Sequence, residues 1–200
     1  MSQSTKTYQD QWIKGQLAVK GIRECASRYE IIKSFCAQQY DRRPFTVCDI
    51  GANMCYFGLR LTEDFPKCSI VAFEFDHFDL RADHVKKNRV NRLLLLNHKL
   101  DLNALTVLGS SCRFDIVLAL SVLHHIGDEF DAWLLALRKL GTHIIAEFAA
   151  KDSRSRKQSQ NHRVPADAIV LGYGDSHIKR GTQRPIVLIP GSRKESAWTY

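Results

Sequence analysis

The sequence predicts an α/β protein with a mostly parallel sheet and helices on both faces. Short β-branched and apolar runs alternate with amphipathic stretches through residues 45–149, and this alternation is typical of βαβ units. The length of 200 residues suits one domain with a full core. Hydrophobic residues at 44% and charged residues at 25% are ordinary for a globular chain, so disordered and fibrous classes are excluded.

The elements of this alternation are predicted from periodicity and from turn residues. Strands are expected at 46–50, 69–75, 93–100, 114–120 and 143–149, and helices at 56–65, 78–88 and 128–140. The last helix has the clearest pattern, because Phe130, Trp133, Leu134 and Leu137 recur at helical spacing and Gly141 follows. Each strand therefore leads into a helix or a turn, as a parallel sheet requires.

The two ends of the chain depart from this alternation. Residues 8–40 are predicted to be mainly helical, since Ile31, Ile32 and Phe35 stand at near-helical spacing. Two late apolar runs, at 168–172 and 185–190, predict a terminal antiparallel pair. Between them and the core lies a polar, basic stretch at 151–163 that cannot build a core, so we expect an exposed loop or a linker there.

The most informative segment is the first strand of the core, which ends in Asp49-Ile-Gly51 and turns at once into a helix. In an open α/β sheet, ligands bind outside the carboxyl ends of the strands, so a nucleoside cofactor is expected here. A dinucleotide site needs Gly-x-Gly-x-x-Gly so that the backbone can approach the pyrophosphate. Asn53 and Tyr56 stand where the second and third glycines belong, which disfavours NAD and FAD.

The string Asp49-Ile-Gly51-Ala-Asn53-Met-Cys55 resembles the first motif of class I S-adenosylmethionine-dependent methyltransferases. The resemblance implies S-adenosylmethionine as the cofactor, with Asp49, Gly51 and Asn53 contacting it. A carboxylate suits this ligand, because its amino acid end and sulfonium are cationic. Cys55 replaces a glycine of the family motif, so its side chain must point away from the cofactor or narrow the pocket.

The second strand ends in the acidic residue Glu74, which lies 25 positions after Asp49, one βαβ step along the chain. Glu74 is expected to accept hydrogen bonds from both ribose hydroxyls, with Asp76 as the reserve candidate. Asp101 stands where the family usually places an acidic residue near the adenine amino group. A helix cap or a turn residue is an equally good interpretation of Asp101.

The fourth strand leads into Ser121-Val-Leu-His124-His125, which resembles the segment after the fourth strand of the same family. Ser121 is therefore expected at the cofactor. His124 or His125 is expected to accept a proton from the acceptor hydroxyl, or else to orient the loop. The family resemblance also implies a Rossmann-like, seven-stranded, mostly parallel sheet with one antiparallel strand near its edge.

The acceptor is addressed by a weaker resemblance. Residues 14–29 look like the helical lead-in of bacterial methyltransferases associated with surface glycan assembly, which implies a glycan, a glycan phosphate or a small anionic metabolite as acceptor. Arg23 and Arg28 would bind the anionic group, or salt-bridge a helix face. Glu147, at the end of the fifth strand, would contact the acceptor or pair with an arginine. The Asn/Asp-Pro-Pro-aromatic and Pro-Cys signatures of nucleic acid amino and cytosine methylation are absent after the fourth strand.

Charge leaves two alternatives open. The formal net charge is +8, of which residues 151–200 carry +6, so RNA is a second candidate partner and the chain would then be an RNA methyltransferase. A noncatalytic protein that keeps the cofactor fold is the third. The six cysteines form no Cys-x-x-Cys pair, so we expect free thiols and no metal site.

The expected organisation is one methyltransferase domain over 1–200. It comprises a helical lead-in at 1–44, a cofactor-binding core at 45–149, and a basic loop with the strand pair at 150–200. The first residues lack the apolar core of a signal peptide, and no apolar run approaches about 18 residues. We therefore expect a cytoplasmic protein without a membrane span.

Overall fold

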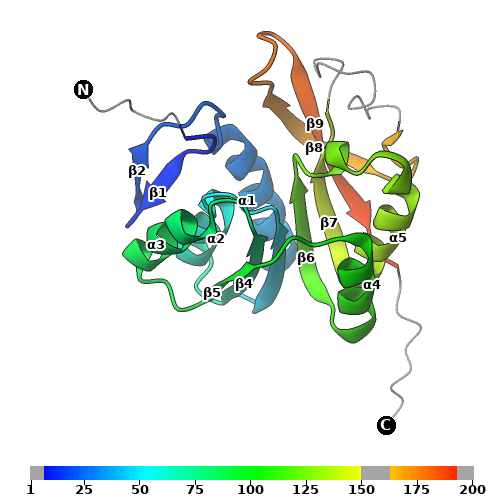
Figure 1. Cartoon of the computed structure of the whole chain (residues 1–200), viewed down its shortest axis with the longest axis horizontal. Helices are drawn as coiled ribbons and strands as arrows, with labels where there is room; N and C mark the ends of the chain where they lie inside the picture. The colour runs from blue at the N-terminus through cyan, green and yellow to red at the C-terminus, as the bar shows by residue number, and fades with distance from the viewer. Residues whose placement is uncertain (1–6, 150–162, 193–200) are drawn as a thin grey trace.

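The computed structural model describes residues 7–149 and 163–192, and it is built around one large sheet (Figure 1). The strands are β1 (Gln11–Ile13), β2 (Gln16–Val19), β3 (Phe45–Ile50), β4 (Cys68–Glu74), β5 (Leu93–Asn97), β6 (Phe114–Leu120), β7 (Gly141–Glu147), β8 (Ile169–Asp175) and β9 (Gln183–Pro190). The helices are α1 (Ala26–Tyr40), α2 (Tyr56–Asp64), α3 (Phe78–Asn88), α4 (Leu102–Ser111) and α5 (Phe130–Leu140), with 3₁₀ turns η1 (Leu123–His125) and η2 (Gly127–Glu129).

The main sheet has seven strands in the order β5-β4-β3-β6-β7-β9-β8. Strands β3 to β7 pair in parallel, whereas β9 runs antiparallel to both β7 and β8. This confirms the predicted Rossmann-like sheet with one antiparallel strand next to its edge. The two late apolar runs of the sequence fall in β8 and β9, which pair antiparallel to each other as predicted.

Two hydrophobic cores lie on opposite faces of the sheet, because successive strand residues point to opposite sides. In β3, Val47 belongs to the core that α1 and α2 cover, while Cys48 belongs to the core that α4 and α5 cover. Neighbouring β6 repeats the alternation with Ile116 and Val117. Helices therefore protect both faces, and the carboxyl ends of β3, β4 and β6 meet at one edge of this layered body.

The prediction of a mainly helical segment at 8–40 is wrong for its first half. Residues 11–19 form the β1–β2 hairpin, and the helix begins only at Ala26. The physical reason is the two-residue turn at Lys14 and Gly15, whose φ angles of 47° and 82° are both positive. A turn of this kind matches the twist of a two-stranded ribbon, and a glycine adopts it without steric cost.

Helix α4 was not predicted, and strand β5 ends at Asn97 rather than at residue 100. Leu102, Leu105 and Leu108 lie on the helix face that packs toward the sheet. The helix has only 10 residues, so this apolar pattern is too short to stand out in the sequence. The basic stretch expected as an exposed loop falls almost entirely outside the described residues. Within residues 7–149 and 163–192, no helix is long and apolar enough to cross a membrane.

Candidate active site

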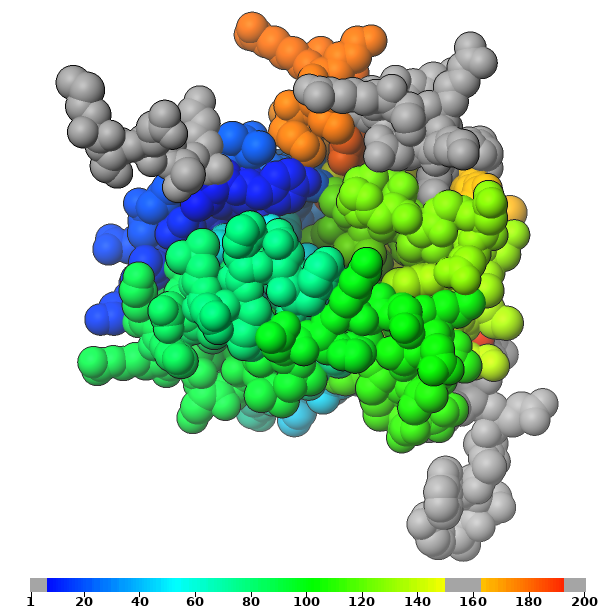
Figure 2. All heavy atoms as spheres, viewed as in Figure 1, coloured from blue at the N-terminus to red at the C-terminus, as the bar shows by residue number. Residues whose placement is uncertain are grey.

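A cavity of about 810 Å³ opens at the carboxyl ends of β3, β4 and β6. Two further segments enclose it: residues 7–25, here called the strap, and the turn between β8 and β9. Figure 2 shows the strap in blue and the β8–β9 turn in orange on the same side of the molecule. Most of the predicted site residues line this cavity: Arg23, Gly51, Asn53, Glu74, Asp101, Ser121, His124 and His125.

The turn between β3 and α2 forms the floor of the cavity. Gly51 has a φ of 69°, and a Cβ at this position would lie 3.0 Å from Val122 Cγ2, so glycine is needed for both reasons. Asn53 also has a positive φ of 50°, which asparagine tolerates better than most residues. Its side-chain Oδ1 accepts a hydrogen bond from Met54 N at 3.0 Å. The turn is therefore held by its own side chains, with its backbone facing the cavity.

Glu74 closes the end of β4 and is only 7% exposed. Its Oε2 accepts from Asn53 N at 2.9 Å, and its Oε1 accepts from Phe75 N and Asp76 N at 2.8 and 3.0 Å. Arg81 Nη1 of α3 lies 2.7 Å from the same Oε1. The carboxylate is thus fixed in place before any ligand arrives, and Oε2, which has one of these contacts against three for Oε1, keeps a lone pair for a hydroxyl donor.

Asp49 lies behind the cavity wall, 2% exposed at the end of β3. Its Oδ2 is buried without a hydrogen-bond partner. Burial, and then the nearby Glu74 carboxylate, raise the pKa of Asp49 to about 7. A cationic group in the cavity would relieve this repulsion, whereas an anionic group would increase it.

Cys55 points away from the cavity. It is fully buried in the α1–α2 core, it is not among the lining residues, and its Sγ lies 4.0 Å from Asn53 O. Its backbone is left-handed, with a φ of 55° at the start of α2. That conformation favours glycine, but the cysteine side chain that adopts it does not narrow the pocket.

Asp101 and Ser121 stand at opposite sides of the cavity. Asp101 is the N-cap of α4, where its Oδ1 accepts from Ala104 N at 2.8 Å, so the cap interpretation of this residue is confirmed while it also lines the cavity. Ser121 has a positive φ of 59° directly after β6. Its Oγ donates to Glu147 Oε2 at 3.2 Å, which links the cofactor side to the end of β7.

Four histidines line the cavity: His98, His124, His125 and His177. The rings of His124 and His125 have centroids 3.9 Å apart. Burial lowers the pKa of His125 below its ordinary value. The pKa of His177 is also lowered, by burial first and then by Arg23, Arg184 and Arg28. These two rings are therefore neutral at pH 7 and able to accept a proton.

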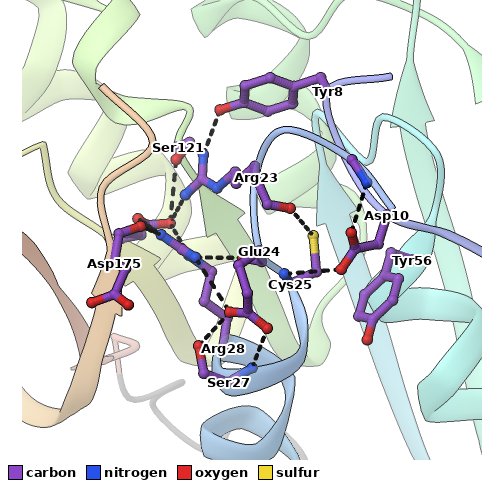
Figure 3. Close-up of polar contacts among 12 residues, drawn as sticks. Tyr8, Asp10, Arg23, Glu24, Cys25, Ser27, Arg28, Tyr56, Ser121 and Asp175 are labelled. Atoms are coloured by element: carbon purple, nitrogen blue, oxygen red, sulfur yellow. Dashed lines mark hydrogen bonds and ion pairs between the residues drawn. The ribbon is translucent and has the colours of Figure 1, made fainter. Parts of the chain in front are cut away.

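Glu147 lies at the centre of a buried ion cluster, and Figure 3 shows its partners Arg23, Arg28 and Ser121 close to one another. Its carboxylate pairs with Arg23 Nη2 and, at 3.2 Å, with Arg28 Nη2. Arg28 is fully buried and also donates to the carbonyl oxygens of Glu24 and Asp175. Of the three residues expected at the acceptor, only Arg23 lines the cavity. Arg28 and Glu147 lie behind it and hold its guanidinium in position.

Comparison with known proteins places this architecture. No family model matches the sequence, and a search of curated proteins finds no match. Among solved structures, WbdD with a kinase inhibitor superposes with a TM-score of 0.68 at 21% identity, over 86% of this chain and 42% of WbdD. Magnesium protoporphyrin IX methyltransferase from Synechocystis PCC 6803, with bound S-adenosylmethionine, gives 0.60 at 16% identity, over 83% of this chain and 79% of that one. The chain has the class I methyltransferase fold.

WbdD is described as a bifunctional kinase-methyltransferase, and the present chain spans about two fifths of its length. Sequence reasoning missed several cavity-lining residues, among them Tyr8, Gln9, His177 and Arg184. Tyr8 and Gln9 belong to the half of the lead-in that was predicted helical, and the other two belong to the β8–β9 hairpin. No spacing within the sequence links these segments to the core motif, so only the assembled fold reveals them.

Proposed function

We propose that the protein is an S-adenosylmethionine-dependent methyltransferase acting on an oxygen acceptor. The observation that carries this proposal is the pair of buried carboxylates at the ends of neighbouring strands, Asp49 on β3 and Glu74 on β4. Asp49 keeps a buried oxygen without a partner and has a raised pKa, so a cationic group in the cavity would stabilise its charged form. A ligand with a cationic end and a ribose diol fits such a site, and an anionic dinucleotide does not.

Different residues of the cavity would bind different parts of the cofactor. Glu74 would accept from the ribose hydroxyls, and the backbone at Gly51 and Asn53 would lie against the sugar and the amino acid end. Asp101 would meet the adenine amino group, and its position supports this role, because it lines the cavity after β5, the strand next to β4 in the sheet. Asp49 would act through its charge, since its side chain lies just behind the turn. A related fold holds the same cofactor in the Synechocystis enzyme.

When bound, the cofactor supplies an electrophilic methyl group. The protein's part is to align the acceptor oxygen with it and to exclude water, which is the main source of rate in a direct displacement. His125 would accept the hydroxyl proton, because its ring is neutral at pH 7 and lines the cavity. His124, 3.9 Å away between ring centroids, is the second candidate for this role.

The acceptor is proposed to be a glycan, a glycan phosphate or another small anionic metabolite. Arg23 on the strap and Arg184 on β9 both line the cavity. Guanidinium groups bind carboxylate and phosphate oxygens in pairs. The similarity to the kinase-methyltransferase WbdD supports an acceptor of this polarity, since kinases make phosphorylated products.

Calorimetry tests the cofactor assignment. The wild type should bind S-adenosylmethionine and S-adenosylhomocysteine, while Asp49→Ala and Glu74→Ala should lose measurable binding and keep a folded circular dichroism spectrum. Asp83→Ala is the control, because Asp83 lies on the exposed face of neighbouring α3 and is far from the cavity lining. Absence of binding in the wild type would refute the methyltransferase assignment. Wild-type affinity in Glu74→Ala would refute the placement of the ribose.

A second experiment separates catalysis from binding alone. The protein should transfer a radiolabelled methyl group to a member of a panel of phosphorylated and carboxylated sugars. His125→Gln should lower kcat by at least about a hundredfold, which is the usual contribution of a general base, and leave cofactor affinity unchanged. Cofactor binding without transfer to any acceptor would favour a noncatalytic binding protein instead.

A further inference from the structure

One outer edge of the main sheet is formed by β8. Within residues 7–149 and 163–192, β8 pairs with β9 and has no strand on its other side. A row of its backbone N–H and C=O groups therefore lacks a strand partner. Proteins usually protect such an edge by a lysine, a proline or a very short strand. Since β8 has 7 residues and contains no Lys, Arg or Pro, its edge is open to another strand.

The side chains at this edge are apolar and exposed on both sides of the sheet. Val170 pairs with Val187, which belongs to the core covered by α4 and α5, and directly paired residues point to the same side. Tyr173 pairs two positions before Val187 in β9, so it lies on that side too. Ile169 lies on the α1 side. These three β8 residues are 49%, 53% and 61% exposed, so no described element covers them.

The two sides alternate along β8 in a palindromic order. Four residues lie on the α1 side: Ile169, Leu171, Gly172 and Gly174. Two of them are consecutive, because the register of the pairing shifts between Val170 and Gly172. From residue 169 to residue 174, the sides are therefore α1, α4–α5, α1, α1, α4–α5, α1. The order is the same in both directions, and its midpoint lies between Leu171 and Gly172.

A strand with this symmetry is complementary to its own copy. In an antiparallel pairing centred on the midpoint, Val170 of one copy would lie opposite Tyr173 of the other, and Ile169 opposite Gly174. Each pair then has both side chains on the same side of the sheet, as strand pairing requires. A β-branched residue opposite an aromatic one is a favourable cross-strand pair. A two-fold axis forms this pair twice, because the same patch is used by both copies.

The charges at the ends of the strand are compatible with this pairing. The acidic residues within 167–176 are Asp167 and Asp175. Asp175 would lie opposite Ala168 of the second copy, and Asp167 opposite Ser176. Like charges directly opposite each other would weaken the pairing, and within these ten positions none occur. Asp167 is also paired within its own chain, with Arg138 at 2.7 Å.

The area of the edge suits a weak dimer. A strand of this length is about 23 Å long, and the sheet together with the α1 layer is about 20 Å thick. Two copies would bury roughly 900 Å², which is typical of weak and transient interfaces. A groove of about 380 Å³ between α1 and β8, lined in part by Ile31, Phe35 and Leu171, adds apolar surface to this strip. We therefore expect a dissociation constant in the micromolar range.

We propose that β8 is a dimerisation edge, at which two copies of this chain pair antiparallel about a two-fold axis between Leu171 and Gly172. The inference goes beyond the proposed function and does not depend on it, because none of the residues assigned to the cofactor lies on β8. β8 leads into the turn that carries His177, so the pairing would support this wall of the cavity from outside.

Sedimentation velocity at about 1 to 100 µM protein measures the dimer. The wild type should shift from the mass of one chain to the mass of two. Val170→Lys should raise the dissociation constant at least about tenfold, because it places a charge at both symmetric pairs. Leu94→Lys is the matched control, since Leu94 is equally exposed but lies on β5 at the opposite edge. Circular dichroism checks that both variants are folded.

A mixing experiment tests the register of the pairing. Tyr173→Glu alone should weaken the dimer as Val170→Lys does. In a mixed dimer of these two variants, the introduced lysine faces the introduced glutamate at one pair, and the native valine faces the native tyrosine at the other. Mixing equal amounts should therefore restore the dimer, because opposite charges across two strands attract.

Each other outcome overturns part of the proposal. A wild type that stays monomeric at about 100 µM refutes the dimerisation edge. A dimer that survives Val170→Lys, or that Leu94→Lys disrupts equally, uses another surface, and β8 is then excluded. Variants that remain monomeric when mixed refute the pairing of Val170 with Tyr173. These measurements need neither cofactor nor acceptor, so their failure is distinct from a failure of the methyltransferase assignment.

Discussion

The two halves of the cavity are built differently. On the cofactor side, Asn53 N binds Glu74 across only 21 positions of the chain, and the key backbone angles belong to one turn. On the acceptor side, Arg23 meets Glu147 across 124 positions, and Arg28 meets Asp175 across 147. The first half is specified by local backbone geometry. The second exists only after the sheet has formed and the strap has docked, so its side chains depend on one another.

Removing Glu147 should have the largest effect on stability. Glu147→Ala leaves the buried guanidiniums of Arg23 and Arg28 without their shared carboxylate. Breaking a buried pair in this way costs about 3–5 kcal/mol. We expect the free energy of unfolding, measured by urea denaturation, to fall by about this amount.

Glu30→Gln is the control for Glu147. Glu30 pairs with Arg60 at 3.3 Å, but its side chain is 59% exposed. Solvent screens such a pair, so the urea midpoint should hardly move. Equal losses in the two variants would show that the acceptor side is solvated, and the contrast between the two halves would then fail.

The cofactor side should show itself in the pH dependence of stability. Asp49 has a pKa raised to about 7 in the fold, against 3.8 for the ordinary side chain. Between these pH values the folded state binds more protons than the unfolded state, so Asp49 makes the protein less stable as the pH rises. In Asp49→Asn this loss is absent, and the stability difference between variant and wild type should grow by up to about 4 kcal/mol from about pH 4 to pH 7.

Urea unfolding at a series of pH values measures this difference. Other carboxylates titrate in the same range, but they are common to both proteins and cancel in the comparison. Glu74→Gln should lower the pKa of Asp49, because the charge of Glu74 is, after burial, the second cause that raises this pKa. Parallel pH profiles for wild type and Asp49→Asn would contradict the burial of an unpartnered carboxylate at this position.

That Gly51, Asn53 and Glu74 gather at one cavity could be predicted from the sequence for a physical reason. Asp49, Gly51, Asn53 and Glu74 occupy one βαβ step, so a short pattern of strand, turn and acidic residue is enough to specify their positions. The same pattern also identified Ser121 and both histidines after β6, since parallel strands end at one edge of the sheet. Their contacts within that edge, such as Ser121 to Glu147, required the coordinates.

The acceptor side could not be predicted in this way. Arg23 was singled out, but Tyr8, His177 and Arg184 were not, because nothing in the local sequence ties the strap to the β8–β9 hairpin. The helical periodicity of α1 was also extended too far toward the N-terminus. The Lys14-Gly15 turn fixes a hairpin, and this local signal prevails over the helical spacing of a few apolar residues.

The anchor of the strap on α2 should contribute less than the ion cluster. The Arg60 guanidinium lies 3.8 Å from the ring centroid of Tyr29 and 4.7 Å from that of Trp12. Cation–π contacts at partly exposed sites are worth about 1 kcal/mol, so Arg60→Met should lower the free energy of unfolding by about 1–2 kcal/mol. Arg60→Lys should recover part of this loss. If Arg60→Lys lowered the free energy of unfolding more than Arg60→Met, the positive charge over the two rings would not be what anchors the strap.

Cys55 should give the smallest net effect, and it tests the local geometry of the cofactor side most directly. Cys55→Gly relieves the steric cost of the left-handed conformation, about 1–2 kcal/mol for a residue with a Cβ, but it also removes a buried side chain whose burial stabilises the fold by a similar amount. The two contributions oppose each other, so unfolding should change by less than about 1 kcal/mol. Cys55→Ala loses the buried sulfur and keeps the unfavourable backbone, so it should be less stable than Cys55→Gly by about 1 kcal/mol.

Neither variant should alter cofactor affinity, because the side chain points into the core and not into the cavity. If Cys55→Ala proved more stable than Cys55→Gly, residue 55 would not have a left-handed backbone. The turn whose Asn53 N donates to Glu74 would then have a different conformation.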